Sequence, residues 1–258
     1  MENGAITQYI DVAQVVLYLF WVFFFGLVAY LTIEGKREGF PLESDGFGKR
    51  SNKSATGLLP MPKPKIYKTK FNGDFEAPHK RDEISGEIAG EPINPFPGAP
   101  VEPTGANPLL DNIGPGSYTN RMDKPDLTAT GDFKIVPMRV EETFKVDPSS
   151  TDPRGLEVKG LEGKVAGTCV DLWVDRSEHL IRYLEIKTPS GKSKLAPFNL
   201  CVISAKGVAV ASLMSSQFED IPELKNQNTL TLLEEDKIMA YFGGGTLMAY
   251  PRRRESFL

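Results

Sequence analysis

The sequence has little of the histidine and cysteine on which many catalytic and metal sites depend. Among its 258 residues, the only cysteines are Cys169 and Cys201, and the only histidines are His79 and His179. No Cys-x-x-Cys pair, and no histidine beside a cysteine, offers the ligand spacing of a zinc site or indicates a catalytic Cys-His pair. We therefore expect both cysteines to be reduced, buried apolar side chains. A disulfide or a metal-binding pair is the alternative.

Other signatures of catalysis and of nucleic-acid binding are also missing. Gly243-Gly244-Gly245 follows a predicted helix, whereas a phosphate-binding loop precedes one and ends in Gly-Lys-Ser or Gly-Lys-Thr. No motif locates a serine-based triad. The net charge of −4 is not the basic footprint of a nucleic-acid-binding protein. We expect no nucleic acid as a partner and no enzymatic turnover by this chain alone.

Charged side chains are absent from one long stretch, residues 12–33, in which Gln14 and Thr32 are the only strongly polar members. At about 1.5 Å per residue this stretch is about 33 Å long as a helix, enough to cross a hydrocarbon core of about 30 Å. A signal peptide is one alternative, but Glu2 and Asp11 stand where its basic start would be. A buried soluble helix is another, but the run is apolar on all sides. The sequence therefore predicts a transmembrane helix.

The charges around this span predict its orientation. No Lys or Arg precedes it, and five follow it within twenty residues: Lys36, Arg37, Lys49, Arg50 and Lys53. The positive-inside rule then places residues 1–11 in the periplasm and the chain after residue 34 in the cytoplasm.

Residues 34–134 form the next predicted segment, which we call the strap. Twelve of the chain's twenty prolines fall between Pro41 and Pro115, and proline disfavours regular helices and central strands. We expect an extended segment with a few short edge strands, such as Lys65–Phe71. Its apolar side chains, among them Tyr67 and Phe96, are too many for a solvated linker, so they predict a surface laid over a partner.

Residues 135–258 are predicted to form a compact, mainly β domain. Val165–Val174 and Leu180–Ile186 are rich in β-branched and aromatic residues and flank a polar stretch, which indicates a hairpin. Turn residues separate three further predicted strands, Leu195–Pro197, Leu200–Ser204 and Val208–Ser212. This pattern favours a small antiparallel barrel or sandwich.

One helix is predicted to close this domain. Glu234, Glu235 and Asp236 supply an acidic first turn, and Gly243 follows the apolar residues as the expected stop. The tail Arg252-Arg253-Arg254 fits either anionic lipid headgroups or a solvated end.

Acidic groups are the remaining candidates for active chemistry. Asp175, Glu178 and Arg182 lie around the predicted hairpin loop. A proton relay needs titratable groups that are close enough to couple. A solvated turn uses the same residue types, and on the local sequence alone it is the simpler interpretation.

Blocks along almost the whole chain carry a resemblance to a known family. The apolar span is followed by Arg37-Glu38-Gly39-Phe40-Pro41-Leu42, and the later blocks are Ile113–Tyr118, Lys134–Pro137, Asp152–Leu156, Leu172–His179 and Leu233–Lys237. In these blocks the chain resembles the H subunit of the photosynthetic reaction centre of purple bacteria, which usually has Tyr in the place of Phe40.

The resemblance implies a cytoplasmic β-barrel of the PRC type that caps two pigment-binding partners, the L and M subunits. Those partners hold bacteriochlorophyll, bacteriopheophytin, quinones and a non-haem iron, and the H subunit ligates none of them. The implied location is the bacterial inner (intracytoplasmic) membrane. Core light-harvesting antenna polypeptides and membrane lipids are further expected partners.

The resemblance also implies a role in proton delivery to the secondary quinone. The family's hairpin-loop carboxylates map onto Asp175 and Glu178, with Arg182 as the adjacent charge partner. Some relatives carry two histidines near the proton entry, where this chain has Thr130 and Asp132. Asp126 and Asp132 are then the expected acidic replacements.

The expected function is therefore that of a non-pigment-binding subunit of a light-driven complex. It would cap and stabilise L and M and help to deliver protons to the secondary quinone. The alternative is a membrane-anchored adaptor or assembly factor that uses the same barrel to bind proteins, without a role in electron transfer.

Overall fold

The structure is a computed structural model that describes residues 4–7, 9–38, 59–77, 89–96 and 99–251. Outside the described residues lie Gly39–Leu42 of the block after the span, Lys49, Arg50, Lys53, Leu58, His79 and the tail from Arg252 to Arg254. The chain divides into two units, residues 1–80 and residues 81–258.

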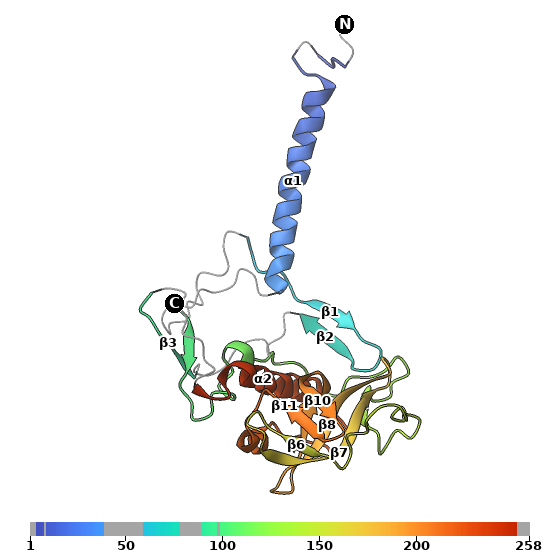
Figure 1. The fold of residues 1–258 in the computed structure, drawn as a ribbon. Coiled ribbons are helices and arrows are strands. Elements are labelled where there is room, and N and C mark those ends of the chain that lie inside the picture. Colours follow the sequence, from blue (N-terminus) through green and yellow to red (C-terminus); the bar gives the residue numbers. More distant parts are fainter. Residues whose placement is uncertain (1–3, 8, 39–58, 78–88, 97–98, 252–258) are drawn as a thin grey trace. The chain divides into compact units, whose positions relative to one another are not determined.

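The first unit contains one long helix, α1 (Val12–Arg37) (Figure 1). It begins where the Asp11 carboxylate accepts a hydrogen bond from the Gln14 backbone at 2.7 Å, a helix N-cap. It continues four residues past the predicted span, because Glu34 and Arg37 form an ion pair and two cations in the last turn suit the helix dipole. Its length and composition allow it to cross a membrane, and its apolar stretch is not buried by other described residues.

A hairpin of strands β1 (Lys65–Lys68) and β2 (Asp74–Ala77) completes the described part of this unit. The strand predicted over residues 65–71 is found, but it ends at Lys68. The backbone N–H and the hydroxyl of Thr69 both donate to the Gly73 carbonyl, and Gly73 adopts a φ of 76°. This tight turn places Phe71 in the loop rather than in the strand.

The second unit is built around a seven-stranded sheet (Figure 1). The strand order is β10-β11-β6-β7-β8-β9, and β5 pairs with β7. The strands are β5 (Ile135–Pro137), β6 (Glu157–Lys159), β7 (Val165–Asp175), β8 (Leu180–Lys187), β9 (Ser193–Pro197), β10 (Cys201–Ser204) and β11 (Gly207–Val210). All five predicted strands of this domain are present. The prediction of a wholly antiparallel sheet is wrong, because β6 and β11 pair in parallel.

Short elements precede and follow these strands. Ahead of the barrel are a hairpin of β3 (Gly90–Pro92) and β4 (Val101–Pro103) and a 3-10 turn, η2 (Gly114–Gly116). Within and after it are two further 3-10 turns, η3 (Phe198–Leu200) and η4 (Ser215–Asp220).

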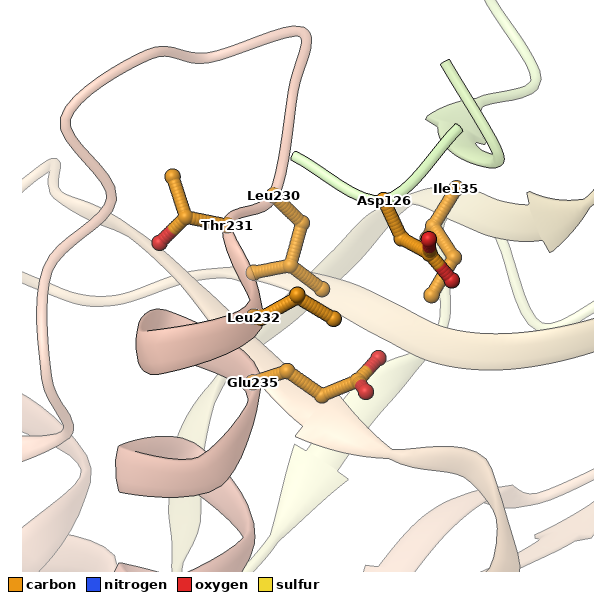
Figure 2. Close-up of a pocket in the computed structure, with 6 residues that line it drawn as sticks. All are labelled: Asp126, Ile135, Leu230, Thr231, Leu232 and Glu235. Atoms are coloured by element: carbon orange, nitrogen blue, oxygen red, sulfur yellow. The ribbon is translucent and has the colours of Figure 1, made fainter. Parts of the chain in front are cut away.

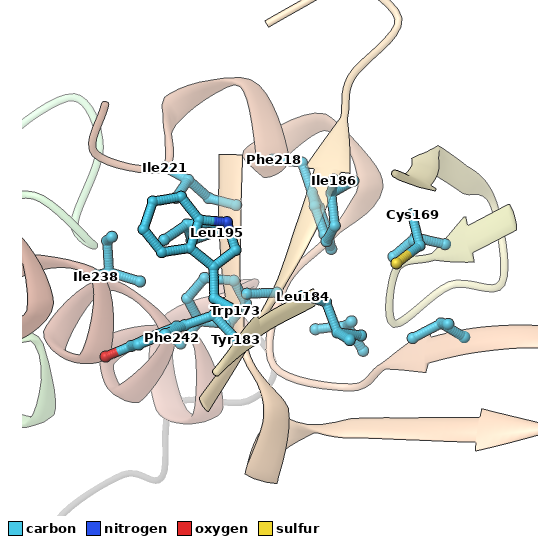
Figure 3. Packing of buried hydrophobic residues seen from close by; sticks show 14 of the residues in the cluster. Cys169, Trp173, Tyr183, Leu184, Ile186, Leu195, Phe218, Ile221, Ile238 and Phe242 are labelled. Carbon is cyan, nitrogen blue, oxygen red and sulfur yellow. The ribbon is translucent and has the colours of Figure 1, made fainter. Parts of the chain in front are cut away.

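The core lies between the sheet and the last helix, α2 (Leu232–Met248). Figure 3 shows the buried side chains gathered from β7, β8, β9, η4 and α2, with Trp173, Tyr183, Phe218 and Phe242 among the largest. Cys169 is buried in the same cluster, and Cys201 packs against it half-buried. The predicted fold class, one N-terminal apolar helix followed by a mainly β domain with a C-terminal helix, is confirmed.

The expected end of α2 at Gly243 is wrong, because the helix continues to Met248. A Cβ atom at Gly243 would lie 2.7 Å from the Pro115 carbonyl, and one at Gly245 would lie 2.3 Å from the Ser212 carbonyl. The glycines thus let α2 approach its neighbours closely and do not stop it. Of the three acidic residues predicted for the first turn, Glu234 and Glu235 lie in it and Asp236 follows it. A Thr231–Glu234 capping box starts the helix.

Candidate functional site

The predicted relay residues lie around the loop that joins β7 to β8. Asp175 is the last residue of β7, and one of its oxygens accepts the backbone N–H groups of Ser177 and Glu178 at 2.8 and 3.0 Å. The Asp175 carbonyl accepts the N–H of His179, which adopts a left-handed φ of 54°. The Asp175 side chain therefore shapes the loop that carries Glu178.

A β-bulge brings Arg182 toward the same loop. Trp173 pairs with Tyr183, but the next residue, Val174, pairs with Ile181, so Arg182 is the extra residue of β8. Bulges re-aim side chains in this way. The side chain of Asp175 is fully buried, and its second oxygen, Oδ2, lies 3.6 Å from the Arg182 Nε. Both atoms are buried, and neither has a hydrogen-bond partner among the described residues.

Lys134 is the centre of this cluster. Its Nζ lies 3.6 Å from Asp126, 3.6 Å from Asp175 and 3.5 Å from Glu178. Burial lowers the pKa of Lys134, but the three carboxylates, Asp175 foremost, outweigh it and hold that pKa above its usual value. We call these four residues and Arg182 the Lys134 cluster.

Backbone pairing fixes Lys134 in this position. Its N–H donates to the Asp126 carbonyl at 2.9 Å, and its carbonyl accepts from Arg176 at 2.9 Å. The following residue, Ile135, pairs with Asp175 across β5 and β7. Sequence reasoning missed Lys134 as a site residue, although it opens one of the blocks that carry the family resemblance.

Asp132, the other predicted acidic entry residue, has different neighbours. It is exposed, its carboxylate accepts the Thr130 hydroxyl at 2.7 Å, and its N–H donates to the Thr128 hydroxyl at 3.1 Å. No ion pair joins it to Lys134 among the described residues. Asp126 thus belongs to the cluster, whereas Asp132 lies in the loop between Asp126 and Lys134.

A small cleft connects Asp126 with the start of α2. Figure 2 shows Asp126 and Glu235 at this cleft, whose other lining residues are Ile135, Leu230, Thr231 and Leu232. The centre of a water molecule can occupy about 10 Å³ of this cleft, which is room for about one water molecule. Burial raises the pKa of the Tyr183 hydroxyl, and hydrogen bonding to the negatively charged Glu235 raises it further. Sequence reasoning did not connect Glu235 with the relay residues.

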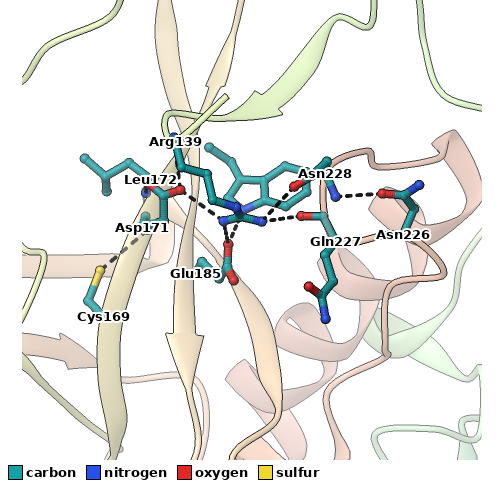
Figure 4. Close-up of polar contacts among 9 residues, drawn as sticks. Arg139, Cys169, Asp171, Leu172, Glu185, Asn226, Gln227 and Asn228 are labelled. Atoms are coloured by element: carbon teal, nitrogen blue, oxygen red, sulfur yellow. Dashed lines mark hydrogen bonds and ion pairs between the residues drawn. The ribbon is translucent and has the colours of Figure 1, made fainter. Parts of the chain in front are cut away.

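A second buried charge network lies on the same two strands. Asp171 and Glu185 face each other across β7 and β8, an arrangement that is repulsive for like charges. Figure 4 shows Arg139 between them, with its Nη1 at 3.0 Å from Asp171 and 2.5 Å from Glu185. The Trp173 indole donates to the same Glu185 oxygen at 3.0 Å. Arg139 also binds the loop of Gln227 and Asn228, so this network joins strands to the loop before α2.

The described residues include two cysteines and one histidine, the usual side chains of metal and thiol sites. No group of three or more His, Cys, Asp or Glu there has the arrangement of a metal site. Cys169 and Cys201 are free thiols, and burial raises the pKa of each to about 12. His179 stacks on Phe144 at a ring distance of 5.7 Å.

Comparison with protein families identifies first the class of the domain. Residues 149–217, which run from just before β6 into η4, match the PRC-barrel domain. Residues 4–140, more than half of the chain, match the photosynthetic reaction centre H-chain N-terminal region. The chain therefore belongs to the photosynthetic reaction centre H-chain family, as its sequence blocks indicate. Membership implies association with L and M subunits in a complex that contains pigments and quinones, in which the H chain is a structural subunit.

Proposed function

We propose that this chain caps and stabilises the L and M subunits and helps to deliver protons to the secondary quinone during light-driven electron transfer. Family membership supports the first role. The Lys134 cluster supports the second, because one ammonium group there lies within 3.6 Å of three carboxylates.

The cluster runs from solvent to the interior. The side chains of Glu178 and Asp126 are 48% and 45% exposed, that of Lys134 is 20% exposed and that of Asp175 is fully buried. Three carboxylates share two cations, Lys134 and Arg182, so the cluster has one negative charge in excess, which a proton on one carboxylate would offset. Protons can enter at the half-exposed groups and move to Asp175, where Arg182 is the next charged neighbour.

The proposed setting is the bacterial inner (intracytoplasmic) membrane. Residues 1–11 face the periplasm and the chain after residue 34 lies in the cytoplasm, in keeping with the cations that follow the span. The partners would carry bacteriochlorophyll, bacteriopheophytin, quinones and a non-haem iron. Core antenna polypeptides and membrane lipids would be further partners.

An absorption spectrum of the complex purified with this chain from its native membranes tests the setting. Near-infrared bands of bacteriochlorophyll and bacteriopheophytin that follow the chain through purification are the expected result. A colourless, stoichiometric preparation would contradict it and favour the adaptor or assembly factor.

Replacement of Glu178 tests the proton role. We expect Glu178→Gln to slow the second electron transfer to the quinone by about tenfold or more and to leave primary charge separation unchanged. A positioned proton-transfer group contributes about 10²–10⁴-fold to a rate, and Asp126, the other half-exposed carboxylate, remains as a parallel entry. Flash-induced absorbance changes across pH measure both steps.

Two further variants make this test specific. Glu178→Asp keeps a carboxylate and should restore most of the rate. Glu142→Gln removes an exposed carboxylate outside the cluster and should have no effect. If the second transfer of Glu178→Gln matches that of Glu142→Gln at every pH, Glu178 is not on the proton path.

A further inference from the structure

The β1–β2 hairpin presents apolar and aromatic side chains that the described residues leave uncovered. Ile66, Tyr67 and Phe71 are 66%, 51% and 44% exposed. The register pairs Tyr67 with Phe75 on one face of the hairpin. A two-stranded hairpin of four-residue strands is marginally stable by itself in water, so a surface that covers these side chains would stabilise it.

Contacts with the end of α1 fix the position of the hairpin relative to this helix. Lys65, the first residue of β1, forms an ion pair with Glu34. Arg37 donates to the Lys63 carbonyl at 3.1 and 3.2 Å, and Lys36 donates to the Leu59 carbonyl. The segment that leads into β1 is therefore bound to the last turn of α1, which directly follows the apolar span.

This attachment places the hairpin at the membrane surface wherever α1 spans the membrane. The headgroup layer is about 5–7 Å thick on each side of the hydrocarbon core. A strand of four residues is about 13 Å long, and electrostatic attraction to the surface acts over about 8–10 Å. The base of the hairpin lies beside Glu34, at the edge of the hydrocarbon core. Its strands are therefore short enough to stay in the headgroup layer or within the range of electrostatic attraction to it.

The charge of this segment has the sign that anionic lipids attract. Residues 59–77 contain four lysines against Asp74 and Glu76, a surplus of two positive charges in a chain with a net charge of −4. Three of the lysines, Lys65, Lys68 and Lys70, lie among the exposed aromatic and aliphatic side chains. Lysine beside tyrosine and phenylalanine is typical of segments at a membrane interface.

We propose that the β1–β2 hairpin lies in the headgroup layer beside α1 and binds anionic phospholipids. Lys68 and Lys70 contact lipid phosphates, and Ile66, Tyr67 and Phe71 enter the boundary between headgroups and acyl chains. The proposal rests on α1 spanning the membrane and not on the proton role of the barrel.

A spin label on the hairpin tests this proposal in the full chain. Phe71→Cys, and separately Ile66→Cys, would be labelled with a nitroxide and reconstituted into nanodiscs of phosphatidylcholine with or without phosphatidylglycerol. The native thiols have a raised pKa of about 12, so they react slowly. With phosphatidylglycerol present, we expect collisions of both labels with oxygen to exceed those with a water-soluble nickel chelate.

Charge reversal at Lys68 and Lys70 tests whether these lysines attract the hairpin to anionic lipid. Each near-surface lysine contributes a factor of about five to membrane attraction, so Lys68→Glu/Lys70→Glu should lower the ratio of membrane-bound to free hairpin by about 25-fold or more. Lys145→Glu/Lys206→Glu, which reverses two exposed lysines of the second unit, should leave the labels unchanged.

Three results would overturn the proposal. Labels open to the nickel chelate in both kinds of disc would place the hairpin in water. Labels shielded from oxygen and nickel alike, whatever the lipid charge, would show that a protein covers it. A Val22→Cys label in mid-span that collides with the nickel chelate as readily as with oxygen would instead show that α1 is not embedded in the lipid.

Discussion

At the residue scale, one cation bridges two buried carboxylates that the sheet register brings together. Asp171 and Glu185 are cross-strand partners whose side chains are 8% and 9% exposed. Without Arg139, two like charges would face each other in a site of low polarity, which costs much more than the loss of an exposed ion pair. Arg139 is thus a stabilising residue of the barrel.

We expect Arg139→Met to lower the free energy of unfolding by about 3 kcal/mol. This is the lower end of the range for removing one partner of a buried pair, because Arg139 is itself 38% exposed. Denaturant titration of the full chain in detergent, followed by tryptophan fluorescence, measures the change.

The matched control is Arg154→Met, which removes the partner of Asp152 in a pair whose two side chains are 40% and 39% exposed. Its cost should stay below about 1 kcal/mol. Equal losses in the two variants would show that Arg139 contributes no more than a surface charge.

At the scale of the element, the glycine triplet of α2 shows how packing overrides propensity. Glycine weakens a helix by about 1 kcal/mol relative to alanine, and Gly243-Gly244-Gly245 reads as a helix end. The helix continues because the main chain of η2 and that of Ser212 approach α2 too closely for any side chain.

Gly245→Ala should therefore destabilise the protein by about 1–3 kcal/mol, the usual cost of overpacking, although alanine is the better helix former. Its Cβ would lie 2.6 Å from Leu213 as well as 2.3 Å from the Ser212 carbonyl. Thr246→Ala, at the next and exposed position of the same helix, should change stability by less than about 1 kcal/mol. Thermal unfolding monitored by circular dichroism compares the two, and a Gly245→Ala variant as stable as Thr246→Ala would refute the close contact.

At the scale of the whole molecule, the state of the two thiols reports whether the barrel is folded. Burial raises the pKa of Cys169 and Cys201 to about 12, compared with about 8.5 for an unfolded thiol. The folded pKa is higher, so this contribution to stability is fully present below about pH 8.5 and is lost as the pH rises toward 12.

We expect the native thiols to react with a thiolate-specific reagent at pH 8 about 10³-fold more slowly than a cysteine introduced at the exposed position Lys206. The difference follows from the thiolate fractions at the two pKa values. Addition of denaturant should bring all of them to a common rate. Fast labelling of Cys169 or Cys201 in the native protein would contradict their burial.

Several parts of the fold and the site could be predicted from the sequence because neighbouring residues decide them. The apolar span, the β7–β8 hairpin and the acidic start of α2 each depend on hydropathy and turn residues within about twenty positions. The position of Asp175 and Glu178 around one loop follows from the hairpin in the same way. The proton role given to them stays a prediction.

Only the tertiary structure decided which charges meet and which are buried. Lys134 reaches Asp175 and Glu178 from some forty residues away, and the bulge that directs Arg182 depends on strand register. No local pattern encodes such pairings, because burial and charge neighbours arise from contacts between distant segments. The sequence by itself determined that the chain has a membrane-spanning segment, a β domain and a family, whereas packing determined where its charges lie.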